Sequence, residues 1–198
     1  MARPRTFDEE RALEGAMRLF WEKGYEAAST QELCTATGLG RSSIYNTFVS
    51  KHALFVRALA HYLDSMTDGQ AAILGDLALP PLARLRQLFR RVIDTEESNR
   101  HERLGIGCLG VNTSAGLSLR DPEAADLLQR DLERRLGALQ DVIASGQHAG
   151  EISRAREPRE VALFLNATIA GMRISAQSGL DRTALESIAE TALDALAP

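Results

Sequence analysis

Residues 29–48, with the sequence STQELCTATGLGRSSIYNTF, decide the fold of this 198-residue chain. They predict two short helices joined by a glycine-containing turn. Ser29 is a favourable residue immediately before a helix, and Glu32 three positions later completes a capping box. Gly38 suits the end of the first helix, because the left-handed backbone conformation costs a glycine little. Two short helices around such a turn are typical of a helix-turn-helix that reads DNA.

The second helix of this motif is expected to begin near Gly40 or Arg41. Ile44 and Phe48 are four residues apart and therefore share its buried face. The polar residues lie off that face and offer groups that can bond to base edges and phosphates. No acidic residue occurs from residue 33 to residue 53. We therefore expect a DNA-binding surface, with the candidate residues Thr30, Gln31, Arg41, Ser42, Ser43, Tyr45, Asn46, Thr47 and Lys51.

The flanking sequence extends the motif into a recognisable domain. An amphipathic helix precedes it and a long apolar-periodic helix follows it. Residues 8–55 resemble the DNA-binding domain of the TetR family of bacterial repressors. The matching residues are Ala16 to Phe20, Gly24-Tyr25, Ser29 to Leu33, Gly38-Leu39, Ser43-Ile44-Tyr45, Phe48, Lys51 and Leu54-Phe55. The sequence departs from the family at Gly40, where many members have a serine that caps the second helix.

The resemblance implies a transcriptional repressor that binds a palindromic operator in double-stranded DNA. It also implies a homodimer formed through the last two helices, and release from DNA by a small-molecule inducer. A helical protein-interaction module without DNA binding is the remote alternative, because generic helix-turn-helix patterns have false positives.

Composition is consistent with such a regulator. The net charge is −4, but residues 1–55 contain seven Lys or Arg and seven Asp or Glu, so the predicted reading domain is balanced. No apolar run approaches the ~20 residues that a membrane span needs, and Met1–Arg5 lacks the apolar stretch of a signal peptide. Two cysteines imply no disulfide framework, which favours the cytoplasm. Phosphate loops, nucleophile elbows and metal-ligand spacings are missing, so we expect neither an enzyme nor a cofactor or metal.

Beyond the motif the pattern is helical throughout, which predicts an all-α fold of nine helices. Helices are expected from residue 51 to the low 70s and over residues 81–98, 108–118, 121–148, 158–178 and 181 to near the end, with a loop over residues 99–107. We predict a helix-turn-helix domain at residues 1–52 and a larger regulatory and dimerisation domain at residues 53–198. The fourth helix should contribute to both.

The last two helices are rich in small and apolar residues, which permit close helix packing. Those in the eighth are Ala162, Ala167, Ala170, Gly171, Ser175 and Ala176, and those in the ninth are Ala184, Leu185, Ile188, Ala189, Ala192, Leu193 and Leu196. This composition favours a dimer interface, although packing within one chain would use the same residues.

The signal that controls such a regulator should act on the second domain. A small apolar ligand is one candidate, in a pocket lined by Tyr62, Met66, Phe89, Ile93, Leu109, Asn112, Phe164, Thr168 and Met172. Thiol chemistry at Cys108 is the alternative, because a helix N-terminus favours a thiolate, and the Gly-Cys run resembles a TetR subgroup with a sensing cysteine. Either set of residues could instead be core, and Cys34 is expected to be structural.

Overall fold

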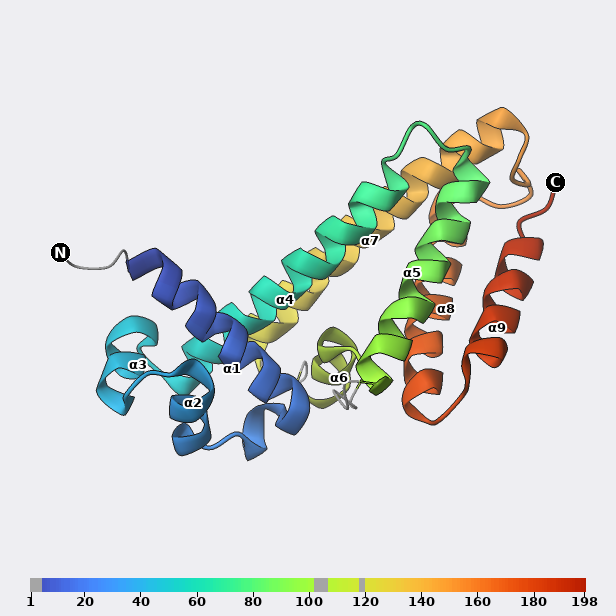
Figure 1. The fold of residues 1–198 in the computed structure, drawn as a ribbon. Helices are drawn as coiled ribbons and strands as arrows, with labels where there is room; N and C mark the ends of the chain where they lie inside the picture. Colours follow the sequence, from blue (N-terminus) through green and yellow to red (C-terminus); the bar gives the residue numbers. More distant parts are fainter. Residues whose placement is uncertain (1–4, 102–106, 118–119) are drawn as a thin grey trace. The chain divides into compact units, whose positions relative to one another are not determined.

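The computed structural model describes residues 5–101, 107–117 and 120–198. Within these ranges it contains nine helices and no strand, as the sequence predicts (Figure 1). The helices are α1 (Arg5–Ala27), α2 (Thr30–Thr37), α3 (Arg41–Phe48), α4 (Lys51–Leu74), α5 (Pro81–His101), α6 (Leu109–Gly116), α7 (Pro122–Ala149), α8 (Pro158–Gln177) and α9 (Arg182–Asp194). None of the described helices is long and apolar enough to cross a membrane.

The chain packs into two compact units. Unit 1 comprises residues 1–64 and 108–128, and unit 2 comprises residues 65–107 and 129–198. Helix α4 therefore contributes to both, as expected, and so does α7. The functional boundary expected after residue 52 stays a prediction.

Unit 1 is built around the apolar face of α1. Ala12, Ala16 and Phe20 recur every four residues on this helix and are fully buried. The Phe20 ring packs edge-on against Phe55 of α4, with 5.2 Å between ring centroids. Gly24 ends the regular part of α1 because its φ of 78° is not helical. The end of α1 is thereby turned toward α2, against which α1 packs.

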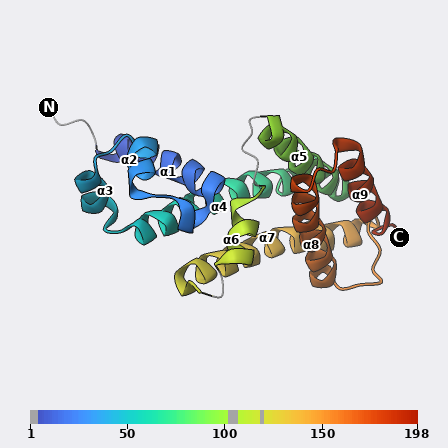
Figure 2. The ribbon, with the colours of Figure 1, turned by 90° about the horizontal axis from the view of Figure 1, so that it is seen from below.

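Unit 2 has its core between α5, α8 and α9, which lie side by side (Figures 1 and 2). Leu85, Phe89 and Val92 of α5 are at most 1% exposed and lie in one apolar cluster with residues of α7, α8 and α9. The core also contains an ion pair, because Arg173 of α8 donates to Glu96 of α5 over 3.0 Å. Apolar contacts and this buried ion pair therefore hold the helices of unit 2 together.

The expected boundary between the fifth helix and the following loop was wrong. Helix α5 continues to His101, so the loop expected from residue 99 begins later; residues 102–106 of that expected loop lie outside the described residues. Its last turn is polar because Arg100 reaches two carbonyl oxygens near the end of α8, those of Ala176 and Leu180. Polarity in this turn therefore marks an inter-helix contact and not the end of the helix.

Candidate nucleic-acid interface

The predicted capping box at the start of α2 is confirmed. Ser29 Oγ accepts a hydrogen bond from the Glu32 backbone N–H over 3.3 Å, and the Glu32 carboxylate accepts from the Ser29 N–H over 3.0 Å. Gly38 ends the helix with φ 68°, the left-handed conformation expected there. Gly40 precedes α3 and offers no side-chain hydrogen bond, so this cap is the weak one that the sequence indicates.

Glu32 also anchors α2 electrostatically. A hydrogen bond from the Lys23 side chain, followed by those from the Ser29 backbone and hydroxyl, lowers the pKa of Glu32 to about 2. The carboxylate is therefore ionised throughout the physiological pH range, and its capping hydrogen bond from the Ser29 N–H persists over the same range. Lys23 of α1 forms an ion pair with Glu32 of α2, and this pair helps to hold α2 against α1.

Helix α3 separates a buried face from a polar exposed one. Ile44 and Phe48 are each 1% exposed and hold α3 against the rest of unit 1. The candidate DNA-binding residues of α3 are all exposed: Arg41, Ser42, Ser43, Tyr45, Asn46 and Thr47. On α2, Gln31 is exposed and Thr30 is half-buried. The structure thus brings these donors and acceptors onto the solvent side of two adjoining helices.

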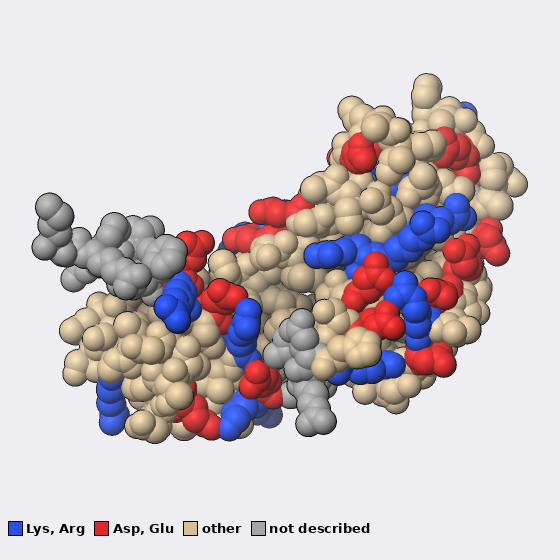
Figure 3. Space-filling view, viewed as in Figure 1, with Lys and Arg blue, Asp and Glu red and all other residues tan. Residues whose placement is uncertain are grey.

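The exposed face of α3 is largely uncharged, as Figure 3 shows. The Arg41 guanidinium lies 5.9 Å from the centre of the Tyr45 ring, within cation–π range. This contact places the one cation of α3 over an aromatic ring whose hydroxyl can reach a phosphate or a base edge. Neutral hydroxyl and amide groups therefore dominate the candidate reading surface, and such groups discriminate bases by hydrogen bonding.

Lys51 opens α4 and contacts the end of α1. Its Nζ donates to the Glu26 carbonyl oxygen over 3.4 Å and lies 4.7 Å from the centre of the Tyr25 ring. Ser50 caps the helix, because its Oγ accepts from the Ala53 N–H over 3.0 Å. A lysine ammonium has three donors, so Lys51 can keep this contact and still bind a phosphate.

Sequence reasoning missed the turn between α3 and α4. Val49 adopts φ 68° and ψ −47°, and Ser50 N–H donates to the Phe48 carbonyl over 2.7 Å. This is a strained γ-turn, unusual for a β-branched residue. Val49 is 78% exposed, so packing does not explain its presence there. The turn sets the direction of α4 relative to the candidate reading helix.

The expected ligand residues do not gather in one described pocket. In unit 1, the Tyr62 hydroxyl donates to Cys108 Sγ over 3.4 Å, and Asn112 is half-buried on α6. Cys108 is the residue that precedes α6, without a side-chain capping bond. Because Tyr62 of α4 engages its sulfur, we assign Cys108 to the packing of α4 on α6 and do not carry the thiol-sensing alternative forward.

Leu109 is buried at the start of α6 in unit 1, and the other candidates belong to unit 2. Phe89, Ile93 and Met172 are buried in its core, and Met66 is half-buried. Phe164 is 46% exposed, and Thr168 donates back to the Phe164 carbonyl over 2.9 Å. Their role in ligand binding stays a prediction.

A second feature of unit 1 that the sequence did not reveal is a charged cluster beside the start of α4. His52 Nε2 lies 2.8 Å from Asp121 Oδ2, and His52 Nδ1 lies 3.7 Å from Glu123. Asp121 also caps α7, as expected, by accepting from the Ala124 N–H over 3.1 Å. These contacts tie the first turn of α4 to the first turn of α7. Among the described residues no group of His, Cys, Asp and Glu is arranged to hold a metal ion.

Comparison with known proteins identifies both parts of the chain. Residues 12–58 match the model of the bacterial regulatory proteins of the tetR family, and residues 81–192 match that of the tetracyclin repressor-like C-terminal domain. The chain is 32% identical to the HTH-type transcriptional repressor ComR of Escherichia coli (strain K12), over 96% of this chain and 90% of ComR. It is 30% identical to the HTH-type transcriptional repressor DhaR of Mycobacterium sp. (strain GP1), over 98% of this chain and 94% of DhaR.

Solved structures agree with this assignment. A cysteine variant of the TetR family regulator CifR, complexed with 26-bp double-strand operator DNA, superimposes with a TM-score of 0.83 at 28% identity, over 98% of this chain and all of CifR. The regulatory protein TetR from Rhodobacter sphaeroides shares the fold with a TM-score of 0.84, at 22% identity over 96% of this chain and 98% of that one. This chain therefore belongs to the TetR family of bacterial transcriptional regulators.

Proposed function

We propose that this protein is a homodimeric repressor that binds a palindromic operator in double-stranded DNA, in the cytoplasm, and that a small molecule releases it. The observation that carries the DNA-binding part is the exposed polar face of α3, held by the buried Ile44 and Phe48 and free of acidic residues. Two relatives that match nearly the whole chain are named transcriptional repressors, and the related CifR is complexed with operator DNA, which supports the proposal.

The dimer is supported by the surface of α8. Leu163, Phe164 and Ile174 are 49%, 46% and 50% exposed on this one helix. Large apolar side chains grouped on a surface mark an interaction site. A two-fold axis would let α8 pack on its copy, and it would present two α3 helices about 34 Å apart to successive major grooves. Most of the apolar residues expected at a dimer interface in α9, among them Leu185 and Leu193, are already buried within unit 2, so α8 is the stronger candidate.

The first experiment is a DNA-binding titration with the sequence upstream of the protein's own gene. Tyr45→Ala, Ser43→Ala and Lys51→Ala should each weaken binding by about 1–3 kcal/mol, the size of one specific contact. Thr183→Ala, which removes an exposed hydroxyl on α9, is the matched control and should bind normally. Normal binding by all three variants, with normal folding, would show that the reading surface is elsewhere.

The salt dependence of operator binding gives a second test. Only Arg41 and Lys51 among the nine candidate residues are cationic, so a dimer would place four such cations at phosphates. The slope of log Kobs against log salt should then be about −4, since each neutralised phosphate contributes about −0.9. A slope near −8 would mean that cations outside this set contact the DNA.

A further inference from the structure

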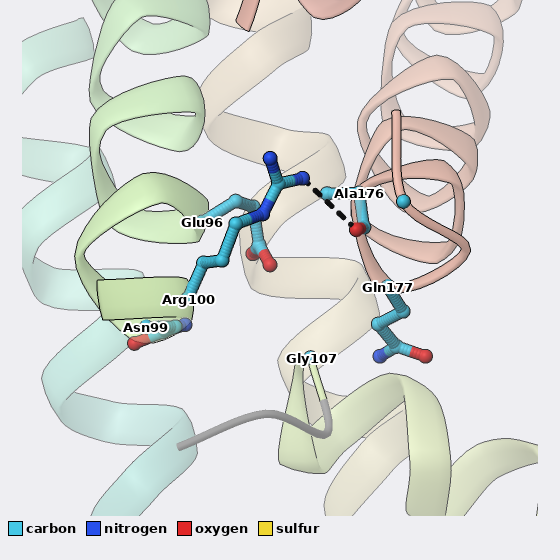
Figure 4. A pocket seen from close by; sticks show the side chains of 7 residues that line it. Glu96, Asn99, Arg100, Gly107, Ala176 and Gln177 are labelled. Carbon is cyan, nitrogen blue, oxygen red and sulfur yellow. Dashed lines mark hydrogen bonds between the residues drawn. The ribbon is translucent and has the colours of Figure 1, made fainter. Parts of the chain in front are cut away.

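A small pocket lies within unit 2, between the last turn of α5 and the last turn of α8. It has a volume of about 140 Å³ and is lined by Glu96, Asn99 and Arg100 of α5, by Ala176 and Gln177 of α8, and by Gly107 (Figure 4). Cavities of about 150 Å³ in proteins hold benzene. The pocket therefore has room for a molecule of about six non-hydrogen atoms.

The pocket contains a buried hydrogen-bond donor that has no partner among the described residues. Asn99 Nδ2 is buried and makes no hydrogen bond to any described residue. Nearly all buried donors in folded proteins have a partner, so this one is available to an acceptor on a bound molecule. Asn99 lies three residues after Glu96 and therefore on the same face of α5. The two polar groups can act on one small molecule.

Glu96 supplies a buried acceptor at the same place. Its side chain is 3% exposed, and its Oε1 accepts from Arg173 over 3.0 Å. Burial raises the pKa of Glu96, although the positive charge and hydrogen bond of Arg173 oppose this effect. Figure 4 shows the Glu96 carboxylate pointing into the space between the two helix ends. A ligand hydroxyl or amide N–H could donate to it.

The charges around the pocket favour an uncharged ligand. Glu96 and Arg173 neutralise each other, and Arg100 donates to the carbonyl oxygens of Ala176, over 3.2 Å, and Leu180. The Glu96 carboxylate would repel an anion, whose attractive partner, Arg100, already bonds to two carbonyl oxygens. The Arg100 guanidinium would repel a cation, whose attractive partner, Glu96, is already paired with Arg173. Burying an additional unpaired charge is costly, whereas burying a hydrogen-bonded neutral group is not.

We propose that this pocket binds a small uncharged molecule of about six non-hydrogen atoms, with an acceptor for Asn99 Nδ2 and a donor for Glu96. This inference rests on the proposed function in one respect, since it names the chemistry of the releasing molecule. The pocket differs from the apolar one expected from sequence, because none of those nine residues lines it. A ligand here would lie against the Arg100 contacts that join α5 to the end of α8, the helix proposed to form the dimer.

Binding to the free protein tests the site without any DNA. Three probes of six non-hydrogen atoms separate the chemistries: lactamide is uncharged and has both a donor and an acceptor, lactate is its anionic counterpart, and benzene is apolar. Titrations followed by two-dimensional ¹H–¹⁵N NMR should show saturable lactamide binding at about 1–10 mM, the range open to so small a ligand. Lactate and benzene should bind at least about tenfold more weakly. The Asn99 side-chain amide resonances should move with lactamide.

Asn99→Leu removes the unpaired amide and keeps the branched shape of the side chain, and it should weaken lactamide binding about tenfold, the value of one buried hydrogen bond. Gln87→Leu, which removes an exposed amide from the same helix, is the control and should not change the affinity. Equal binding of benzene and lactamide, an unchanged affinity in Asn99→Leu, or no shift of the wild-type Asn99 amide up to 100 mM would each overturn the proposal and leave only solvent in the pocket. Since operator binding is measured separately, loss of DNA binding would not affect these results.

Discussion

Gly15 offers a sharp test of how α1 positions the DNA-reading helices. It lies in the middle of α1, where alanine would ordinarily be the better helix former by about 1 kcal/mol. In the structure, however, a Cβ at this position would overlap the Ala36 carbonyl oxygen of α2 and lie 2.9 Å from its carbon. Carbon atoms in good contact are about 3.5–4.0 Å apart. Relieving the carbon contact alone would take roughly 0.6–1.1 Å, and the overlap with the oxygen requires more, so Gly15→Ala must displace α2 by at least about 1 Å or distort α1.

The steric effect should outweigh the gain in helix propensity. Overpacking costs about 1–3 kcal/mol when side chains can adjust, and here the obstacle is backbone, so we expect a net loss of about 2 kcal/mol. For a chain of this size this loss lowers Tm by roughly 4–8 °C in scanning calorimetry. Operator affinity should also fall at least about tenfold, because hydrogen bonds to bases tolerate only a few tenths of an ångström.

Gly137→Ala is the matched control for this experiment. Gly137 lies inside α7, and its added Cβ would meet nothing within 4 Å. It should gain about 1 kcal/mol from helix propensity alone and leave DNA binding unchanged. If Gly15→Ala proves as stable as Gly137→Ala and binds the operator normally, the close approach of α1 and α2 does not constrain the reading head.

Three further variants test single interactions. Val49→Gly should raise the free energy of unfolding in urea by about 1 kcal/mol, because strain of about 1–3 kcal/mol is relieved and only part is lost to chain entropy; equal or lower stability would contradict the strain. Asp121→Asn should remove an acid-dependent loss of stability. Burial raises the pKa of Asp121, but hydrogen bonds from the Ala124 N–H and His52 outweigh this effect, so the pKa lies below its ordinary value. That stabilisation is present above the ordinary aspartate pKa of about 3.9 and is lost as pH falls through the lowered one, so identical pH profiles would refute it. Arg173→Met should cost about 3–5 kcal/mol in chemical denaturation by leaving the Glu96 carboxylate buried alone, and Glu96→Leu combined with it should restore most of the loss.

The sequence predicts this fold well where local signals and spacing coincide. The capping box, Gly38 and the Ile44–Phe48 pair each have a local physical cause, and the structure confirms them. Gly15 and Val49 could not be interpreted in the same way. The constraint on Gly15 is the approach of a carbonyl 21 positions away, and the conformation of Val49 contradicts the preference of its residue type.

The candidate effector pocket shows a different limit of sequence reasoning. Apolar periodicity directed attention to large side chains such as Phe89 and Met172, which are 1% exposed in unit 2 and whose role in ligand binding stays a prediction. For the polar last turn of α5, which contains Asn99 and Arg100, we had instead expected a loop. A helix that ends in polar residues and a loop of polar residues have the same pattern, and only the tertiary contacts of Arg100 tell them apart.

Helix α8 shows how one apolar pattern can serve two partners. Leu165, Ile169 and Met172 recur at helical spacing and are buried in unit 2. Leu163 and Ile174 are eleven residues apart, hence nearly aligned on a second face, and both are about half exposed. A helix that is apolar on two faces is normally buried on both. Phe164, which we expected in a ligand pocket, is also part of this exposed surface. The sequence could not show this, because periodicity does not say whether an apolar face meets its own chain or another copy. The second face of α8 therefore needs a partner that a single chain does not supply, and a second copy, packed about a two-fold axis, would bury it.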